Sequence, residues 1–154
     1  NYGNYPYITS STTLPYGACS LGFSPKLIRN IYGASKIYDT RSGVDPLFPV
    51  ELLEDNELKQ IATLGEEYGA TTGRPRIVNW LNLDLLLKAA NISGTTHIVI
   101  NKMDIFRQSK KYKLFWNKKL KTFPDLESYK KFIFNAMFKN GIKNIIFSSN
   151  KYRI

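Results

Sequence analysis

Residues 69–76, GATTGRPR, combine two glycines, two adjacent threonines and two arginines around one proline. None of these side chains is large and apolar, so the stretch is not built to fill a hydrophobic core. It offers hydroxyl groups, bare backbone and two guanidinium groups separated only by Pro75. Guanidinium groups pair with carboxylates and phosphates, which makes Arg74 and Arg76 candidates for binding anions.

A second polar stretch directly follows a short apolar run. Residues 96–101, THIVIN, are typical of a buried strand in a parallel sheet, and Lys102, Met103 and Asp104 come next. Ligands bind at the carboxyl ends of such strands. A carboxylate there can accept hydrogen bonds from the ring N–H and the exocyclic amine of guanine, while a lysine stem lies along the base. The pattern N-K-x-D therefore indicates guanine recognition, with an ordinary turn at a strand end as the alternative.

The same pattern occurs in P-loop GTPases, which also need G-x-x-x-x-G-K-[ST] to bind the phosphates. That phosphate-binding pattern does not occur in the 154 residues. Either the phosphate loop lies in a part of the protein outside this sequence, or the guanine site belongs to another family.

Strand and helix patterns alternate along the chain, which predicts an α/β fold with a largely parallel sheet. The expected strands are residues 5–11, 33–41, 96–101 and 144–148. The expected helices begin at Pro25, at Pro49, at Leu83 and after a capping box at residues 122–125. We expect the helix from Pro49 to end at Gly69, the next at Gly94 and the last at Asn140-Gly141. A turn-rich loop is expected at residues 41–49.

The net charge of +10 is concentrated in the last third of the chain. Residues 102–154 hold 14 Lys and Arg against 3 acids, and seven of these bases fall within residues 107–121. A basic segment interleaved with aromatic residues can bind nucleic acid through phosphate contacts and stacking. The alternative is a solvated or polyphosphate-facing surface in a chain rich in Lys, Asn and Ile. No nucleic-acid-binding motif accompanies the charge, so the second interpretation is favoured.

The chain has no apolar run of about 18 residues, and its first residues lack the basic and apolar regions of a signal peptide. Cys19 is the one cysteine, so it has no partner for an internal disulfide bond. We therefore expect a reducing, cytoplasmic location without membrane contact.

Seven short motifs follow one another in the order GNYPYITSS, LGFSPK, IYDTRSG, PLFPVEL, GEEYGATTGRPR, WLNLDLL and NKMD. Together they resemble the adenylosuccinate synthetase family over residues 3–105, and GATTGRPR with its flanking EEYG is the most specific part. Later residues match more loosely, and residues 107–121 have no counterpart. The resemblance implies a P-loop-NTPase-like α/β fold, a largely parallel sheet with flanking helices. Residues 1–154 would form the C-terminal portion of a single such domain.

The resemblance also implies a reaction. Adenylosuccinate synthetases use GTP to phosphorylate the 6-oxygen of IMP and then displace that phosphate with the amino group of L-aspartate. Mg²⁺ helps to neutralise the transferred phosphoryl group, and the family works as a homodimer. The family's catalytic aspartate, catalytic histidine, phosphate loop and metal site belong to its N-terminal part, so these residues alone are expected to be inactive. His97, the one histidine, lies in a predicted strand and is expected to pack there.

The family's site residues carry over to matching positions of this sequence. Thr9 matches a threonine that binds the 5′-phosphate of IMP, Arg74 an arginine that reaches IMP and aspartate, and Arg76 an arginine that reaches GTP. The loop that binds the aspartate carboxylates corresponds to Ala70, Thr71, Thr72, Gly73, Arg74, Pro75 and Arg76. The guanine contacts correspond to Lys102, Met103, Asp104, Ser148, Ser149 and Asn150.

Two positions depart from the family pattern. Asn150 stands where a glycine is expected, and a side chain there hinders the close approach of backbone to the base. Asp45 is an additional residue beside the substrate-facing turn, where it can alter the fit of the nucleotide.

Two other functions stay open at the level of the sequence. A phage-type relative that joins aspartate to (d)GMP shares the loop and the chemistry, and the residues that discriminate the base lie largely outside this sequence. A non-catalytic remnant that binds nucleotide or nucleic acid is the second alternative. The combination of Arg74, Arg76, Lys102 and Asp104 counts against a remnant, because no structural requirement explains it.

Overall fold

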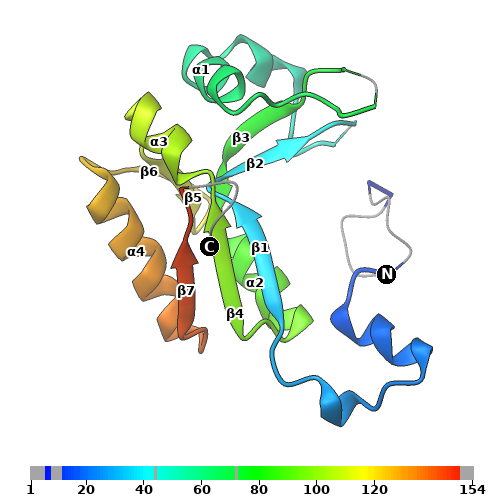
Figure 1. The fold of residues 1–154 in the computed structure, drawn as a ribbon. Helices are drawn as coiled ribbons and strands as arrows, with labels where there is room; N and C mark the ends of the chain where they lie inside the picture. Colours follow the sequence, from blue (N-terminus) through cyan, green and yellow to red (C-terminus); the bar gives the residue numbers. More distant parts are fainter. Residues whose placement is uncertain (1–5, 8–11, 44, 72, 150–154) are drawn as a thin grey trace.

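The computed structural model describes residues 6–7, 12–43, 45–71 and 73–149, which form two β-sheets with helices around them (Figure 1). The first sheet has the strand order β1-β4-β7, with β1 at Tyr32–Lys36, β4 at His97–Asn101 and β7 at Asn144–Phe147. Both pairings are parallel, which confirms the predicted α/β fold with a parallel sheet and flanking helices. The carboxyl ends of these strands consequently meet at one edge of the sheet.

The second sheet has the order β2-β3-β5-β6, with β2 at Tyr38–Arg41, β3 at Ile77–Asn82, β5 at Lys113–Trp116 and β6 at Lys119–Thr122. Strands β2 and β3 are antiparallel, β3 and β5 are parallel, and β5 and β6 form an antiparallel hairpin. The sequence patterns predict none of β3, β5 and β6. The strand predicted at 33–41 serves both sheets, because the chain crosses between them at Ile37, whose N–H donates to the Asn101 carbonyl at 3.0 Å.

Helices α2 (Leu83–Ser93) and α4 (Leu126–Lys139) match the predictions, and Figure 1 shows α2 behind β1 and β4 and α4 alongside β7. Helix α2 ends at Gly94, which adopts a left-handed conformation, as predicted. The start of α4 corrects the predicted capping box. The cap is Asp125, whose carboxylate accepts from the Ser128 N–H at 2.7 Å, and Thr122 belongs to β6 instead.

Two predicted helices are shorter than the sequence pattern indicates. The one at Pro25 is a single 3₁₀ turn, η2 (Pro25–Leu27), after which the backbone is extended at Ile28. The one at Pro49 breaks into the 3₁₀ helix η3 (Val50–Glu54) and helix α1 (Asn56–Leu64). Asp55 causes the break, because its carboxylate caps α1 by accepting from the Glu57 and Leu58 N–H groups. Helix α1 then ends at Gly65, four residues before the predicted end at Gly69.

Two elements remain: the 3₁₀ helix η1 (Pro15–Leu21) near the N-terminus and helix α3 (Met103–Ser109). The sequence patterns do not predict α3, which begins inside the NKMD motif. Most of the strand predicted at residues 5–11 lies outside the described residues. In the part that the structure describes, no helix is long and apolar enough to cross a membrane.

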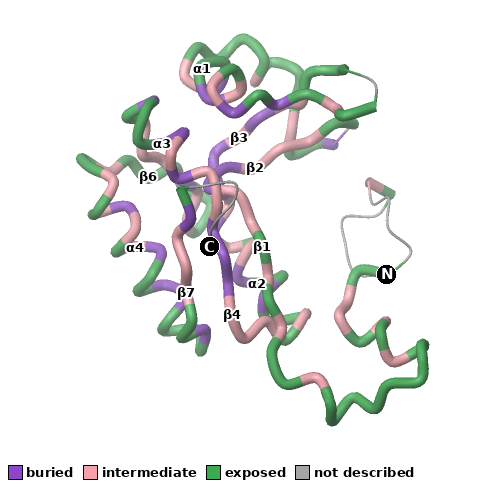
Figure 2. The backbone as a smooth tube through the Cα atoms, in the orientation of Figure 1, coloured by how far each residue is buried: buried purple, intermediate pink, exposed green. Residues whose placement is uncertain are grey.

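The core is centred on Phe106 of α3, which is fully buried. Its ring lies 6.2 Å from that of Tyr38, 6.3 Å from Trp80, 6.4 Å from Tyr112 and 5.4 Å from Tyr129. These neighbours come from β2, β3, the segment before β5, and α4. The buried stretches of β3 and β4 run through the middle of the molecule in Figure 2. One aromatic side chain therefore anchors α3, and with it the NKMD motif, to the second sheet and to helix α4.

Candidate functional site

The NKMD motif lies where β4 ends, next to the end of β7. Lys102 has a left-handed backbone (φ 66°), which turns the chain from the strand into α3. The Met103 N–H donates to the Ser148 carbonyl at 3.1 Å, and the Ser148 N–H donates to the Ile100 carbonyl at 2.8 Å. Met103 and Ser148 are buried, whereas Asp104 is partly exposed. The two stretches assigned to guanine are thus brought together at the carboxyl edge of the first sheet.

Residues 69–71 and 73–76 belong to a closed loop between α1 and β3. At its base the Arg76 N–H donates to the Glu67 carbonyl at 2.9 Å, and closer to the tip the Gly69 N–H donates to the Arg74 carbonyl at 2.8 Å. Gly73 supplies the positive φ (63°) that the tip needs, and its N–H donates to the Gly69 carbonyl at 2.9 Å. The loop is therefore pinned at its base and open at its tip.

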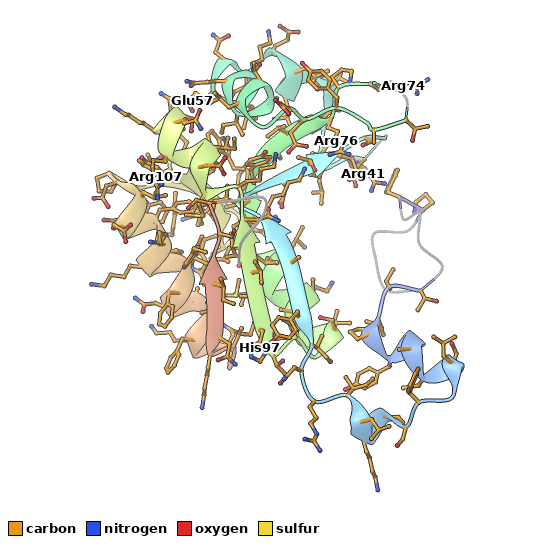
Figure 3. All side chains as sticks on the ribbon, viewed as in Figure 1. Arg41, Glu57, Arg74, Arg76, His97 and Arg107 are labelled. Carbon is orange, nitrogen blue, oxygen red and sulfur yellow. The ribbon has the colours of Figure 1, made fainter. Side chains whose placement is uncertain are left out.

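Several residues assigned to the aspartate-binding loop lie on the surface at this tip. They are Ala70, Thr71, Gly73, Arg74 and Pro75. Arg76 is partly buried, and Figure 3 shows it together with Arg41 and Arg74 on one side of the molecule. Thr9, Thr72 and Asn150 lie outside the described residues. The placement leaves the tip accessible to a ligand and directs Arg76 inward.

Glu67 links the base of the loop to the NKMD motif. This carboxylate is 2% exposed and accepts hydrogen bonds from Lys36 Nζ at 2.6 Å, Tyr38 Oη at 2.7 Å and Arg76 Nη1 at 3.0 Å. Lys102 Nζ lies 4.0 Å from Glu67 Oε1. Burial works to raise the pKa of Glu67, but the bonds from Lys36, Tyr38 and Arg76 hold that pKa below its usual value. The carboxylate is therefore ionised at neutral pH.

The sequence patterns do not identify Glu67, Lys36 or Tyr38 as site residues. A signal for the latter two exists, because residues two apart on a strand point to the same face. Lys36 and Tyr38 have this spacing and flank the crossing at Ile37. Nothing in the sequence distinguishes Glu67 from its exposed neighbour Glu66.

Asp45 organises the turn that follows β2. Its side chain is 7% exposed, lies 3.5 Å from Arg41 Nε, and accepts from the Leu47 N–H at 3.0 Å. Its carbonyl accepts from the Phe48 N–H at 2.9 Å. Arg41 also donates to the Tyr7 carbonyl through Nη2. Asp45 thus fixes the orientation of Arg41 at this turn.

His97 lies at the opposite end of β4 from Lys102, and Figure 3 shows it far from Arg74 and Arg76. Its ring stacks on Tyr32, with a centroid distance of 4.6 Å, and its Nδ1 lies 2.8 Å from Thr96 Oγ1. The side chain is thus engaged in local packing at the edge of the sheet.

The residues that the structure describes contain no group of three or more His, Cys, Asp or Glu side chains that could hold a metal ion. A largely apolar cavity of about 420 Å³ lies between the residues before η1, β1 and α2, lined in part by Leu14, Ala34 and Leu86. No residue assigned to IMP, aspartate or guanine lines it.

The fold and the site define an α/β protein whose polar loops gather at the carboxyl ends of a parallel sheet, the usual position of a nucleotide site in such proteins. The family model of adenylosuccinate synthetase matches residues 1–134, a range that includes the basic residues 107–121. The chain belongs to the adenylosuccinate synthetase family.

Similar proteins come from distant organisms. The chain is 45% identical to the adenylosuccinate synthetase of Petrotoga mobilis over 114 residues, which are 74% of this chain and 27% of that protein. It is 43% identical to that of Komagataella phaffii over 132 residues, 81% of this chain and 30% of that protein. The chain therefore spans about a third or less of the curated relatives that it matches.

A solved structure, a fully ligated adenylosuccinate synthetase from Plasmodium falciparum, is similar in fold with a TM-score of 0.75. The match covers 95% of this chain and 44% of that chain at 23% identity. Nearly all of the observed fold thus corresponds to part of one larger protein.

Proposed function

We propose that the complete protein containing these residues joins L-aspartate to the 6-position of IMP, with GTP as the phosphoryl donor, and so produces adenylosuccinate for AMP synthesis. The purine 6-oxygen is a poor leaving group until it is phosphorylated, which is why a ligation of this kind consumes a nucleoside triphosphate. Family membership supports the general activity, and the site supports the assignment of the ligands.

The observation that carries this proposal is the convergence of two motifs on one carboxylate. Arg76 from the anion-binding loop and Lys102 from the guanine motif both approach Glu67, at 3.0 Å and 4.0 Å. A nucleotide whose base meets Lys102 and Asp104 can therefore extend its phosphates toward Arg76. Arg74, which is exposed on the same loop, is assigned to IMP and aspartate.

The remaining expectations belong to the same proposal. GTP would enter with Mg²⁺, held by residues other than those described here, so we assign this chain no step through the metal. The protein would act as a homodimer in the cytoplasm. Neither nucleic acid nor a membrane is an expected partner.

A substrate panel tests the reaction. The complete protein is incubated with GTP, Mg²⁺ and L-aspartate together with IMP, GMP or dGMP, and both phosphate release and the new nucleotide are measured. We expect aspartate-dependent turnover with IMP. Turnover with dGMP alone would replace the proposed substrate by that of the phage-type relative. Nucleotide binding without any turnover would identify a non-catalytic protein.

Substituting Asp104 by Asn tests the guanine assignment. An amide cannot accept both guanine N–H groups, and charge-assisted hydrogen bonds contribute about 1.5–3 kcal/mol, so KM for GTP should rise about 10- to 150-fold. Xanthosine triphosphate, whose 2-oxo group accepts a bond from the amide, should be used better by the Asp104→Asn variant than by the wild type.

The matched control for this substitution is Asp84→Asn. Asp84 occupies the same position in the first turn of α2 as Asp104 does in α3, and both are partly exposed. The control removes the same charge from a helix start away from the site and should leave the nucleotide preference unchanged. An equal KM in the wild type and in Asp104→Asn would refute the guanine assignment.

A further inference from the structure

The corner formed by residues 65–67 contacts both halves of the candidate site. On one side, Glu67 holds Arg76 through its backbone carbonyl at 2.9 Å and through its carboxylate at 3.0 Å. On the other side, Lys102 Nζ donates to the Gly65 carbonyl at 2.7 Å and lies 4.0 Å from the Glu67 carboxylate. A displacement of Arg76 or of Lys102 therefore changes contacts made by the same three residues.

This corner is packed so that the carboxylate itself cannot swing freely. A Cβ on Gly65 would lie only 2.2 Å from Tyr38 Oη, which shows how closely the corner meets β2. Tyr38 in turn donates its hydroxyl to Glu67 at 2.7 Å. The side chains of Arg76 and Lys102 are 32% and 35% exposed, so any rearrangement falls on them rather than on Glu67.

The charges around the corner do not balance. Lys36, Arg76 and Lys102 bring three positive charges, while Glu67 brings one negative charge and the neighbouring Asp104 a second. Burial lowers the pKa of Lys36, and the charges of Arg76 and Lys102 lower it further against the opposing effect of Glu67. An anion that draws Arg76 away would reduce the repulsion among the three cations. Glu67 could then make stronger contacts with Lys36 and Lys102.

We propose that Glu67 is a positioning residue that couples ligand binding at residues 69–76 to guanine binding at residues 102–104. Occupation of the loop by an anionic ligand withdraws Arg76 from Glu67. Lys102 then moves closer to the carboxylate and is fixed where its stem meets the base. Because coupling between two sites is reciprocal, bound guanine nucleotide increases the affinity of the loop for its ligand by the same factor. This inference rests on the proposed function.

The test measures the affinity for GDP in the complete protein, with and without saturating IMP and succinate. GDP has no transferable γ-phosphate and succinate has no amino group, so nothing reacts during the titration. In the wild type, IMP and succinate should tighten GDP binding by at least about fivefold. In Glu67→Gln this ratio should fall below about twofold. A merely structural role would not lower the ratio, because partial unfolding weakens GDP binding most when IMP and succinate are absent and so would raise the ratio.

The matched control is Glu66→Gln, which removes the same charge from the adjacent exposed residue and should keep the wild-type ratio. If Glu67→Gln does not fold, Lys102→Met takes its place, because it removes the other end of the link from a partly exposed position. Retention of the ratio in Glu67→Gln or in Lys102→Met would overturn the coupling. The coupling would also be overturned if the wild-type enzyme turns over IMP but binds GDP equally tightly with and without IMP and succinate. A wild type that neither binds GDP nor turns over would instead refute the proposed function.

Discussion

Asp39 gives the sharpest prediction about stability. Its carboxylate is partly buried on β2 and accepts one hydrogen bond, from the Asn82 N–H at 2.9 Å. Burial raises the pKa of Asp39 to about 6 from an ordinary value of 3.8, and the bond from Asn82 offsets only part of this effect. The charged form is thus held where it is poorly solvated.

The direction of the pH dependence follows from this raised pKa. The folded protein binds the proton of Asp39 more tightly than the unfolded chain, so stability falls as the pH rises from about 4 through about 6. Above that window the full penalty is present. One pKa unit corresponds to about 1.4 kcal/mol, so the shift of Asp39 sets an upper limit of about 3 kcal/mol on the stability lost at high pH. Because the carboxylate is partly solvated, we expect a loss of about 1–3 kcal/mol.

Replacing Asp39 by Asn removes the charge and keeps an oxygen that can accept from Asn82. We expect a gain in the free energy of unfolding of about 1–3 kcal/mol at about pH 8, and about a third of that gain at about pH 4.5. Urea unfolding of the complete protein, followed by tryptophan fluorescence, measures both values. Asp84→Asn controls for the general loss of one acid. An equal gain at both pH values, or a loss at the higher one, would refute the assigned cause.

Two further substitutions test the packing described above. Gly65→Ala should destabilise the protein by about 1–3 kcal/mol in thermal unfolding, because the added methyl group meets Tyr38 Oη. The φ of Gly65 (−82°) suits alanine, so backbone strain does not contribute. An unchanged melting temperature would contradict this contact. Leu114→Ala should cost about 2–5 kcal/mol, because the side chain is fully buried. Leu120→Ala on the paired strand, where the side chain is 46% exposed, should cost less than about 0.5 kcal/mol. A loss for Leu114→Ala as small as that for Leu120→Ala would argue that the hairpin does not contribute to the core.

The sequence predicts the elements whose hydrophobic period is long or uninterrupted. Helix α4 repeats its buried positions over fourteen residues, and β4 is a continuous apolar run, so both are recognised correctly. Helix α1 is predicted too long because the Leu pattern runs past Asp55, whose carboxylate competes for the backbone and starts a new helix.

The hairpin β5–β6 shows which features of the basic segment its charge alone does not predict. Its lysines flank three consecutive apolar residues: Leu114, which belongs to the core, and Phe115 and Trp116, which pack against it. The turn uses positive φ at Asn117 and Lys118, and without a glycine it carries no strong hairpin signal. Two lysines of the segment are also paired, because Lys111 and Lys113 both contact Glu57. The segment is therefore part of the folded core as well as a charged surface.

For the candidate site, the sequence locates the motifs but not the residue between them. The guanine motif follows an unmistakable strand, and the anion-binding loop stands out by its composition. Glu67 and Glu66 look alike in the sequence, but Glu66 has a left-handed backbone (φ 50°) and is exposed, whereas Glu67 is buried. The contacts of this corner with Tyr38 of β2 are long-range, and no local pattern encodes them.

The single residue that separates β1 from β2 has a consequence for the tolerated length of this segment. Lys36 and Tyr38 flank Ile37 and both bind Glu67, which requires that they point to the same side of the chain. Inserting or deleting one residue here would turn one of them away and shift every pair of β2 with β3. Relatives that conserve this arrangement should therefore vary in side chains at this crossing but never in length, so its spacing is a more durable mark of the site than the identity of any one residue.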